Sequence, residues 1–169
     1  MKKKKLLFAG LLLSVALFSC NQTQKNTTDM EKDFSNSGTF PLGNPGSPEW
    51  FTGEVHVQGL VDPAEIEGLY SVGQVTFEPG GKTNWHTHPI GQVLLVLEGR
   101  GFYQERGKPA QELTPGTVVA IPKNVEHWHG ASADTKLVHI AISNISDGSA
   151  VTWMAPVSNE EYTEVNDRQ

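Results

Sequence analysis

The chain has little cysteine, no long uninterrupted apolar run and no excess of basic residues, and each shortage excludes a class of protein. Cys20 is the only cysteine among 169 residues, so a monomer cannot form a disulfide bond. The apolar stretch Leu6–Leu17 is shorter than the roughly 20 residues that a transmembrane helix needs. The net charge of −6 makes nucleic acid an unexpected partner. No Ser-His-Asp arrangement, phosphate-cradling glycine loop or CxxC pair stands out.

The first twenty residues are typical of an exported protein. Lys2–Lys5 form a basic segment, the apolar stretch follows, and Leu17–Cys20 resembles a bacterial lipobox. This resemblance implies cleavage before Cys20 and lipidation of its thiol, and hence a lipoprotein held to a membrane by its lipid anchor alone, facing the periplasm or the cell surface. The alternative is that Cys20 is an ordinary small residue of a signal segment.

These features divide the chain into three parts. We expect a signal peptide over residues 1–19, the lipidated cysteine and a flexible tether over 20–47, and one domain over 48–169. The tether is polar and has no hydrophobic period, although Phe40–Leu42 could dock on the domain. The remaining length is that of a single small domain.

Nearly every segment of the domain has the pattern of a β-strand. Alternating residues predict strands over 54–57 and 70–77, and further strands are expected over 102–105, 117–121 and 136–143. Gln92–Leu97 is apolar on both faces, which predicts a strand buried between two sheets. Only 62–68 and 158–165 could be short helices. Many short strands with Gly and Pro turns predict an all-β sandwich or jelly-roll barrel.

Four residues in two blocks have the spacing of a metal site. His86 and His88 would point to the same side of a strand, about 6.5–7 Å apart. Gln92 could return to the same cavity from the next strand, and His127 would complete the set from a distant one. Three imidazoles and one oxygen suit a divalent transition metal and leave positions open for a substrate. Alternatively, His86 and His88 form a polar strand face, and Gln92 lines the pocket as a hydrogen-bond donor.

The two blocks resemble the two motifs of the cupin superfamily. Four residues fit the first motif in register: Gly80, His86, His88 and Gly99. Three fit the second motif: Gly116, Pro122 and His127. Gln92 stands where Glu is usual, Asn124 replaces a Gly, and Ala131 replaces an Asn; Asn still tolerates a left-handed turn. The resemblance implies a single-domain cupin, a double-stranded β-helix in the form of a jelly-roll barrel.

Gln92 gives the predicted ligand set an unusual charge. With Gln in place of Glu every protein ligand is neutral, so the metal keeps its full +2 charge and becomes a better Lewis acid. The ligands do not fix the metal, because affinity follows the Irving–Williams order and Fe, Ni or Zn would also be accepted.

Two further histidines are candidates for the chemistry. His139 shares a strand face with Ala141 and Ser143, whose small side chains leave room for a ligand, so we expect His139 to be a catalytic base. A lone His among apolar residues is otherwise a satisfied core residue. His129 follows His127 by two positions and lies on the same face of a regular strand. It could line the substrate pocket, or it could be structural.

A closer resemblance covers Trp50–Tyr162 and concerns one cupin branch, the manganese-dependent hydroxynitrile lyases of bacteria. The matching segments are Trp50–Gly53, Val75–Gly80, Trp85–Pro89, Gly91–Gln92, His127–Ala131, His139–Ile142, Trp153–Met154 and Glu160–Tyr162. The resemblance implies Mn²⁺ bound by His86, His88, Gln92 and His127, and a homodimer or homotetramer. It further implies that Gly73 and Val75 shape the pocket. His139 would accept the hydroxyl proton of a cyanohydrin, or of a related α-hydroxy compound, as cyanide leaves and a carbonyl forms.

Two other functions suit the same residues. Three histidines with open coordination positions also suit a dioxygenase of the quercetinase or cysteine-dioxygenase type. A non-catalytic, lipid-tethered cupin that captures a small ligand is the third interpretation. Oxygen consumption would separate the dioxygenase from the lyase, and substitution of His139 would separate the lyase from the binder.

Overall fold

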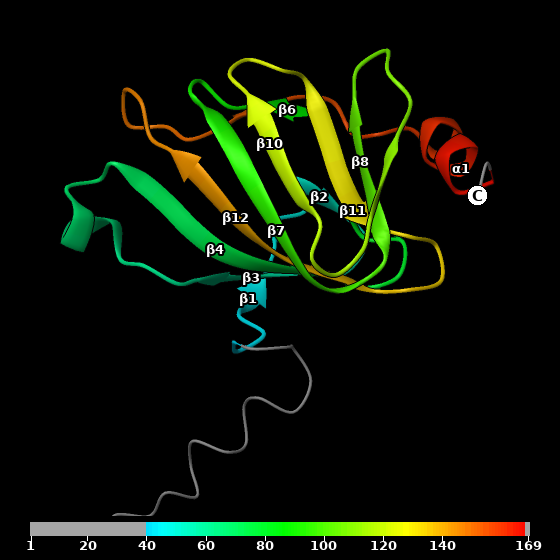
Figure 1. Cartoon of the computed structure of the whole chain (residues 1–169), viewed down its shortest axis with the longest axis horizontal. Coiled ribbons are helices and arrows are strands. Elements are labelled where there is room, and N and C mark those ends of the chain that lie inside the picture. Colours follow the sequence, from blue (N-terminus) through cyan, green and yellow to red (C-terminus); the bar gives the residue numbers. More distant parts are fainter. Residues whose placement is uncertain (1–39, 168–169) are drawn as a thin grey trace, which may run out of the picture.

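The computed structural model describes residues 40–167 and shows a β-sandwich (Figure 1). Its strands and helices, in chain order, are β1 Asn44–Pro45, β2 Phe51–Thr52, β3 Val55–Gly59, the 3-10 helix Pro63–Ile66, β4 Tyr70–Phe77, β5 Lys82–Thr83, β6 His86–Thr87, β7 Gly91–Gly99, β8 Gly101–Glu105, β9 Gln111–Leu113, β10 Val118–Pro122, β11 His127–Ala131, β12 Leu137–Asn144, β13 Thr152–Trp153 and α1 Asn159–Asp167. The all-β prediction and the two predicted short helices are therefore confirmed. The predicted signal peptide, Cys20 and residues 20–39 of the tether lie outside the described residues.

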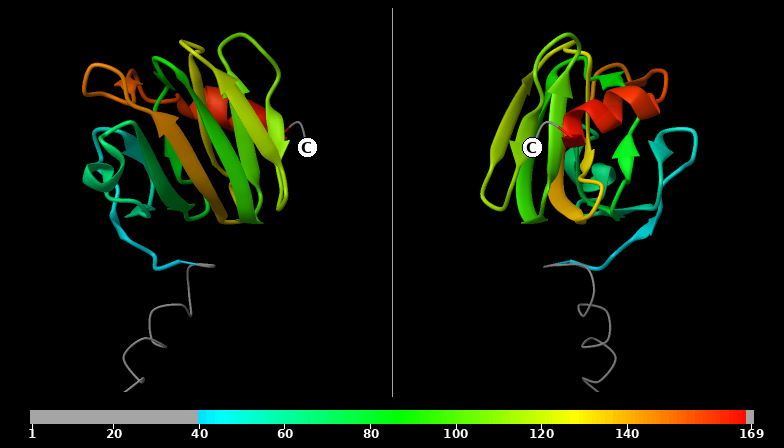
Figure 2. Two further views of the ribbon diagram at one scale, coloured as in Figure 1. Left: turned by 60° about the vertical axis from the view of Figure 1, so that its left-hand side comes forward. Right: turned by 90° about the vertical axis from the view of Figure 1, so that its right-hand side faces the viewer.

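Two antiparallel sheets form the sandwich, and Figure 2 shows them face to face. The first sheet has the order β1-β3-β4-β12-β7-β10. The second has the order β13-β6-β11-β5-β2, with β8 paired to β11 and β9 beyond it. Sequence neighbours are thus distributed over both sheets, so β6 and β7 bring residues 86–92 from one layer to the other. This crossing lets His86 and Gln92 face the same interior.

Apolar residues that alternate along the strands fill the space between the sheets. Phe77, Leu94 and Leu137 are fully buried there, as expected for the inner face of a half-buried antiparallel sheet. A second cluster lies on the outer side of the second sheet, where Trp85 and Trp128 pack under α1. Both tryptophans therefore point away from the interior, as their positions beside His86 and His127 predict.

The structure corrects two expectations about the sheets. Residues 40–47 belong to the folded part rather than to the tether, because β1 pairs with β3 and Gln74 Nε2 donates to the Pro41 carbonyl at 3.2 Å. The prediction that β7 is buried on both faces is wrong. Leu94 and Val96 are buried, but Leu95 is only partly buried and Leu97 is 36% exposed. No helix or second sheet among the described residues covers the outer face of this strand.

One turn required by the second motif forms as expected. Asn124 adopts φ +60°, the left-handed conformation that Asn tolerates better than most residues. Its N–H donates to the His88 carbonyl at 2.8 Å, so this turn ties the loop before β11 to the loop that carries His88. None of the helices within residues 40–167 has the length and apolar content needed to cross a membrane.

Candidate metal centre

A cavity of about 260 Å³ opens between the two sheets. Its wall is mainly apolar, with Phe51, Val151 and Trp153 among the lining residues. The predicted pocket residues Gly73, Val75 and His129 all line it, as do His86, His88 and Gln92. The cavity therefore brings a polar cluster and an apolar wall together in one space between the sheets.

Three of the predicted ligands are adjacent imidazoles. His86 and His127 are directly paired across β6 and β11, and their ring centroids lie 4.1 Å apart. The His88 ring centroid lies 5.1 Å from that of His86 and 5.4 Å from that of His127. His86 and His127 are fully buried or nearly so. Residues separated by about forty positions in the sequence thus form one cluster.

Each of these three imidazoles has its Nδ1 next to a backbone carbonyl. Nδ1 lies 2.9 Å from the Asn84 oxygen in His86, 2.6 Å from the Ala150 oxygen in His88, and 2.8 Å from the Val125 oxygen in His127. A carbonyl can only accept, so Nδ1 carries the proton and the lone pair is on Nε2. Nε2 of His88 and of His127 is buried without a hydrogen-bond partner among the described residues. This arrangement is typical of metal-binding histidines, whose second nitrogen is held by a hydrogen bond.

Gln92 is oriented in the same way. Its Nε2 donates to Ser143 Oγ at 3.1 Å, and its Oε1 is buried without a hydrogen-bond partner. A buried carbonyl oxygen with no partner is costly, about 1–3 kcal/mol, and such atoms indicate an absent ligand or ion. The orphaned oxygen and the free Nε2 atoms fit a divalent metal with three nitrogen donors and one oxygen donor.

The cluster also fits a metal in its protonation state. Burial lowers the pKa of His86 well below its ordinary value, lowers that of His88, and lowers that of His127 to about 4. The positive charge that each imidazole would carry also disfavours protonation of its neighbours. All three are therefore neutral near pH 7, as ligation requires.

His129 and His139 form a second pair beside this cluster. His139 Nε2 lies 3.1 Å from His129 Nδ1, and both side chains are buried against Phe77. His139 does not line the cavity: His129 stands between it and the open space. Burial lowers the pKa of His139 to about 4 and that of His129 well below its usual value. Ala141 and Ser143, whose small side chains we expected to leave room for a ligand, do line the cavity, whereas His139 itself contacts the ring of His129.

The distances alone give an overlapping set of three. One nitrogen from each of His86, His127 and His129 lies within 4.8 Å of the others, so His129 could also ligate. We favour His88 over His129 because His88 Nδ1 is held by a carbonyl, whereas His129 Nδ1 meets the ring of His139.

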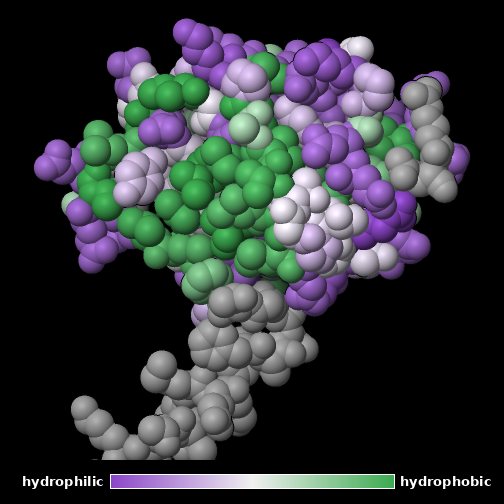
Figure 3. Space-filling view, viewed as in Figure 1, coloured by the Kyte–Doolittle hydropathy of each residue, from purple (hydrophilic) through white to green (hydrophobic). Residues whose placement is uncertain are grey.

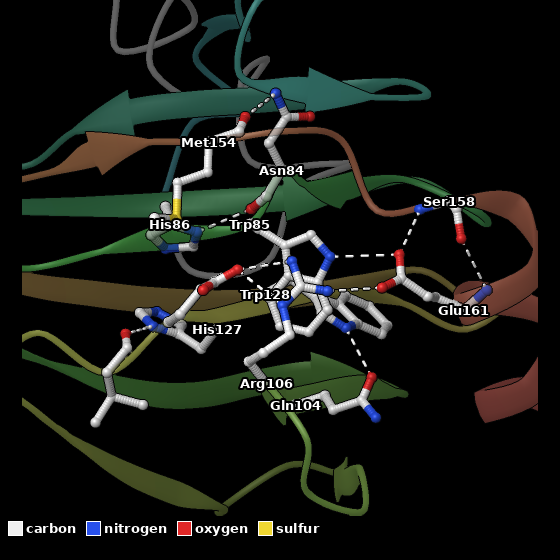
Figure 4. A network of polar contacts seen from close by, with 12 residues as sticks. Asn84, Trp85, His86, Gln104, Arg106, His127, Trp128, Met154, Ser158 and Glu161 are labelled. Carbon is white, nitrogen blue, oxygen red and sulfur yellow. Dashed lines mark hydrogen bonds and ion pairs between the residues drawn. The ribbon is translucent and has the colours of Figure 1, made fainter.

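A network of polar contacts behind the cluster connects the two ligand strands to α1 (Figure 4). The Arg106 guanidinium lies 3.5 Å from the ring centroid of Trp85 and forms ion pairs with Glu126 and Glu161. Glu161 also accepts a hydrogen bond from Trp85 Nε1 at 3.4 Å. These contacts hold the residue that precedes His86 and the residue that precedes His127.

Sequence reasoning missed the residues that orient the ligands. The acceptors for His86, His88 and His127 are backbone carbonyls, which leave no side-chain signal. Ser143 could have been identified from the sequence, because it shares a strand face with His139 and Ala141. Arg106 and Glu161 could not be paired from sequence, since 55 positions separate them.

Comparisons with known proteins identify the family of this chain. The cupin domain family matches residues 73–143. The chain is 45% identical to an (R)-mandelonitrile lyase of Granulicella tundricola over 120 residues, which cover 69% of this chain and 88% of the relative. A solved cupin-like protein of Thermotoga maritima is 47% identical, with a TM-score of 0.74, and the match covers 78% of this chain and 98% of that one. An acireductone dioxygenase of Bacillus velezensis is 27% identical over 79 residues, which cover 44% of this chain and 42% of the relative.

Proposed function

We propose that this chain, which belongs to the cupin family, is a metal-dependent lyase. Its reaction would be the cleavage of α-hydroxynitriles to a carbonyl compound and hydrogen cyanide. One observation carries the proposal: His86, His88 and Gln92 of the donor cluster line the same mainly apolar cavity as His129, whose ring is in hydrogen-bond contact with His139. The similarity to an (R)-mandelonitrile lyase supports the reaction.

His86, His88, Gln92 and His127 would hold the metal, which we propose to be Mn²⁺. When bound, the metal supplies a Lewis acid that polarises a substrate oxygen and makes its proton more acidic. The carbonyls of Asn84, Ala150 and Val125 each accept from the Nδ1 of one imidazole, which leaves the Nε2 lone pairs for the metal. Ser143 holds the amide of Gln92 with its oxygen free.

The His129–His139 pair would take the hydroxyl proton. His129 Nε2 has no hydrogen-bond partner among the described residues and belongs to a side chain that lines the cavity. It can accept the proton while its Nδ1 proton passes to His139 Nε2 along the hydrogen bond between the two nitrogens, which lie 3.1 Å apart. As the proton leaves, the C–O bond becomes a carbonyl and the electrons of the C–CN bond leave with cyanide. Cyanide then takes up the proton held by the histidine pair, which gives hydrogen cyanide and returns the pair to its neutral form. The basic role expected of His139 is thus shared, with His129 at the substrate.

The rest of the cavity would hold the substituent of the substrate. Gly73 and Ala141 contribute almost no side chain to one wall, while Phe51 and Trp153 present aromatic rings on another. Apolar walls with a few fixed polar groups are typical of small-molecule sites. An aromatic or branched aliphatic α-hydroxynitrile matches this division better than a charged one.

The test uses the soluble chain that begins at Asn21, depleted of metal and reloaded with Mn²⁺. Benzaldehyde release from mandelonitrile is followed against the spontaneous reaction. We expect metal-dependent release that falls at least about 100-fold in His129→Ala and in His139→Ala, the scale of general acid–base catalysis. Substitution of His56, which lies on β3 of the first sheet and is not among the residues that line the cavity, serves as the control. Wild-type protein that binds Mn²⁺ but releases no benzaldehyde contradicts the proposal.

A dioxygenase is the second candidate, supported by the similarity to an acireductone dioxygenase over part of the chain. An oxygen electrode measures whether the same metal-loaded samples consume oxygen when substrate is added. Lyase turnover consumes no oxygen, so oxygen uptake that depends on substrate would favour the dioxygenase.

A further inference from the structure

The strand that carries His86 has little backbone pairing of its own. β6 is two residues long, and its pairing with β11 consists of the bridge between His86 and His127. Its other neighbour, β13, is also two residues long. β11, in contrast, is paired with β8 at five consecutive positions. The sheet therefore fixes His127 firmly, whereas the position of His86 depends on contacts outside the β-ladder.

The contacts that support His86 come from the C-terminal part of the domain. The Trp85 N–H donates to the Ala155 carbonyl at 3.1 Å, and the Met154 N–H donates to the Trp85 carbonyl at 2.9 Å. The same segment leads into α1, whose Val165 packs in one cluster with Trp85. The backbone that precedes His86 is thus held by a segment whose own position depends on the docking of α1.

Arg106 joins this segment to the strand of His127. Its Nη1 lies 2.7 Å from Glu161 Oε1 on α1, and its Nη2 lies 2.6 Å from Glu126 Oε1. Its guanidinium carbon lies 3.5 Å from the ring centroid of Trp85, and Figure 4 shows the guanidinium over the indole. Two ion pairs and a ring contact at once suit a planar guanidinium better than an ammonium group. We call these four residues the Arg106 clamp: Trp85, Arg106, Glu126 and Glu161.

The clamp is connected to the interior through consecutive residues. Trp85 belongs to the cluster under α1, whereas the next residue, His86, lines the cavity. Trp85 is 2% exposed and His86 is 1% exposed, and side chains packed at this density do not shift independently of one another. A displacement of the indole on the outer side of the sheet would therefore move the imidazole on the inner side.

The ion pairs of the clamp lie at the surface. The side chains of Arg106, Glu126 and Glu161 are 45%, 31% and 37% exposed. The side of the molecule that carries α1 is mainly hydrophilic, while hydrophobic residues gather over the first sheet (Figure 3). Ion pairs in contact with water contribute little to the free energy of unfolding. The contribution of the clamp should therefore appear in the geometry of the ligands rather than in the stability of the fold.

We propose that Arg106 is a positioning residue of the metal centre, which keeps His86 at the distance from His127 that a bound metal requires. The inference rests on the proposed metal site. Arg106 is not among the residues that line the cavity, so it acts through Trp85 and Glu126 rather than on the substrate.

The sign of the effect separates positioning from charge. Arg106→Gln removes a positive charge from the neighbourhood of a bound cation, so an effect through space would strengthen Mn²⁺ binding. Loss of positioning would weaken it. We expect the dissociation constant for Mn²⁺ to rise about 10-fold, the lower end of the range for residues that orient metal ligands.

Arg100 provides the matched control. It immediately precedes β8, as Arg106 immediately follows it, and its guanidinium carbon lies 5.5 Å from the ring centroid of Phe102. It forms an ion pair with Glu112, and neither partner is adjacent in sequence to a proposed metal ligand. Arg100→Gln therefore removes the same charge and a similar set of contacts without reaching the metal centre.

Two measurements on the metal-depleted soluble chain from Asn21 test the proposal. Calorimetry gives the Mn²⁺ affinity of each variant, and the visible absorption of the Co²⁺-loaded protein reports the geometry of the ligands. Arg106→Gln should change both, and Arg100→Gln should change neither. Arg106→Lys keeps the charge without the planar contact, so its affinity should fall between those of wild type and Arg106→Gln. The melting temperatures of the metal-free proteins should be alike.

A double-mutant cycle assigns the effect to the clamp. Glu161→Gln removes the ion pair but keeps the capping box with Ser158, in which Gln also serves. If both residues act through one network, Arg106→Gln should weaken Mn²⁺ binding less in the Glu161→Gln background than in wild type. Unchanged affinity and an unchanged Co²⁺ spectrum in Arg106→Gln overturn the proposal, as do full additivity or an equal loss in Arg100→Gln. Wild type that binds neither metal overturns the proposed metal centre itself, and the clamp with it.

Discussion

Acid should destabilise the metal-free protein through its buried histidines, and His139 permits the clearest measurement. His139 is completely buried, and burial lowers its pKa from 6.5 to about 4. Since one pKa unit corresponds to about 1.36 kcal/mol, this difference is worth about 3.4 kcal/mol of stability. The value is of the same order as the whole stability of many small domains, about 5–15 kcal/mol.

The direction follows from which state takes up the proton. Below pH 6.5 the unfolded chain protonates at His139, whereas the folded chain stays neutral there until about pH 4. The contribution is therefore complete above pH 6.5, is lost progressively as the pH falls to about 4, and changes no further below that. His139→Gln removes the titrating group and keeps a polar side chain of similar length.

Urea unfolding of EDTA-treated protein, followed by tryptophan fluorescence between pH 4 and pH 8, gives the free energy of unfolding of both forms. Relative to wild type, His139→Gln should gain about 3 kcal/mol between pH 7 and pH 4, where the folded His139 begins to take up its own proton, whatever its stability at pH 7. His56→Gln is the control for the loss of an imidazole outside the cluster. Parallel pH curves for wild type and His139→Gln would refute the reasoning.

Three further predictions each concern a single residue. Ser143→Ala should weaken Mn²⁺ binding about 10-fold or more, measured by calorimetry, because Gln92 loses the partner of its Nε2; an unchanged affinity would mean that Gln92 does not ligate. Gly99→Ala should lower the free energy of unfolding by more than about 2 kcal/mol, because Gly99 has φ +82° and a Cβ there would overlap a backbone oxygen. Gly107→Ala, with φ +75° and open space around the Cβ, should lower it by less in the same urea titration, and equal losses would contradict the steric argument. Cys20→Ala in the full chain should abolish incorporation of labelled palmitate, and retained label would exclude lipidation at Cys20.

The sequence predicted the strands well because their pattern is local. The strand pattern along Tyr70–Phe77 predicted the bounds of β4, although all four residues Gln74–Phe77 are buried rather than every second one. The failure at β7 has a physical cause: Val93, Leu95 and Leu97 are as apolar as residues buried between sheets. Hydrophobic periodicity shows that both faces of a strand are apolar. It does not show whether other parts of the same chain bury the second face.

The candidate site was predictable in its members but not in its geometry. The spacing of His86, His88 and His127 predicted one cluster, and the three rings are adjacent. The order of His129 and His139 relative to the cavity was not predictable. Strand alternation places both on inner faces, and only the pairing of two separate sheets decides which ring reaches the open space.

Ligand orientation and ligand charge act together in this site. Neutral imidazoles are available only because burial keeps their pKa values low, and the same burial would make a Glu at position 92 harder to ionise without a metal. Gln92 avoids that dependence, since its oxygen is neutral at every pH and is aimed by Ser143 rather than by charge. A neutral donor set binds a cation less strongly than one with a carboxylate, but it leaves more of the positive charge for the substrate. The proposed proton acceptor must then be neutral and close by, and His129, backed by His139, meets both conditions.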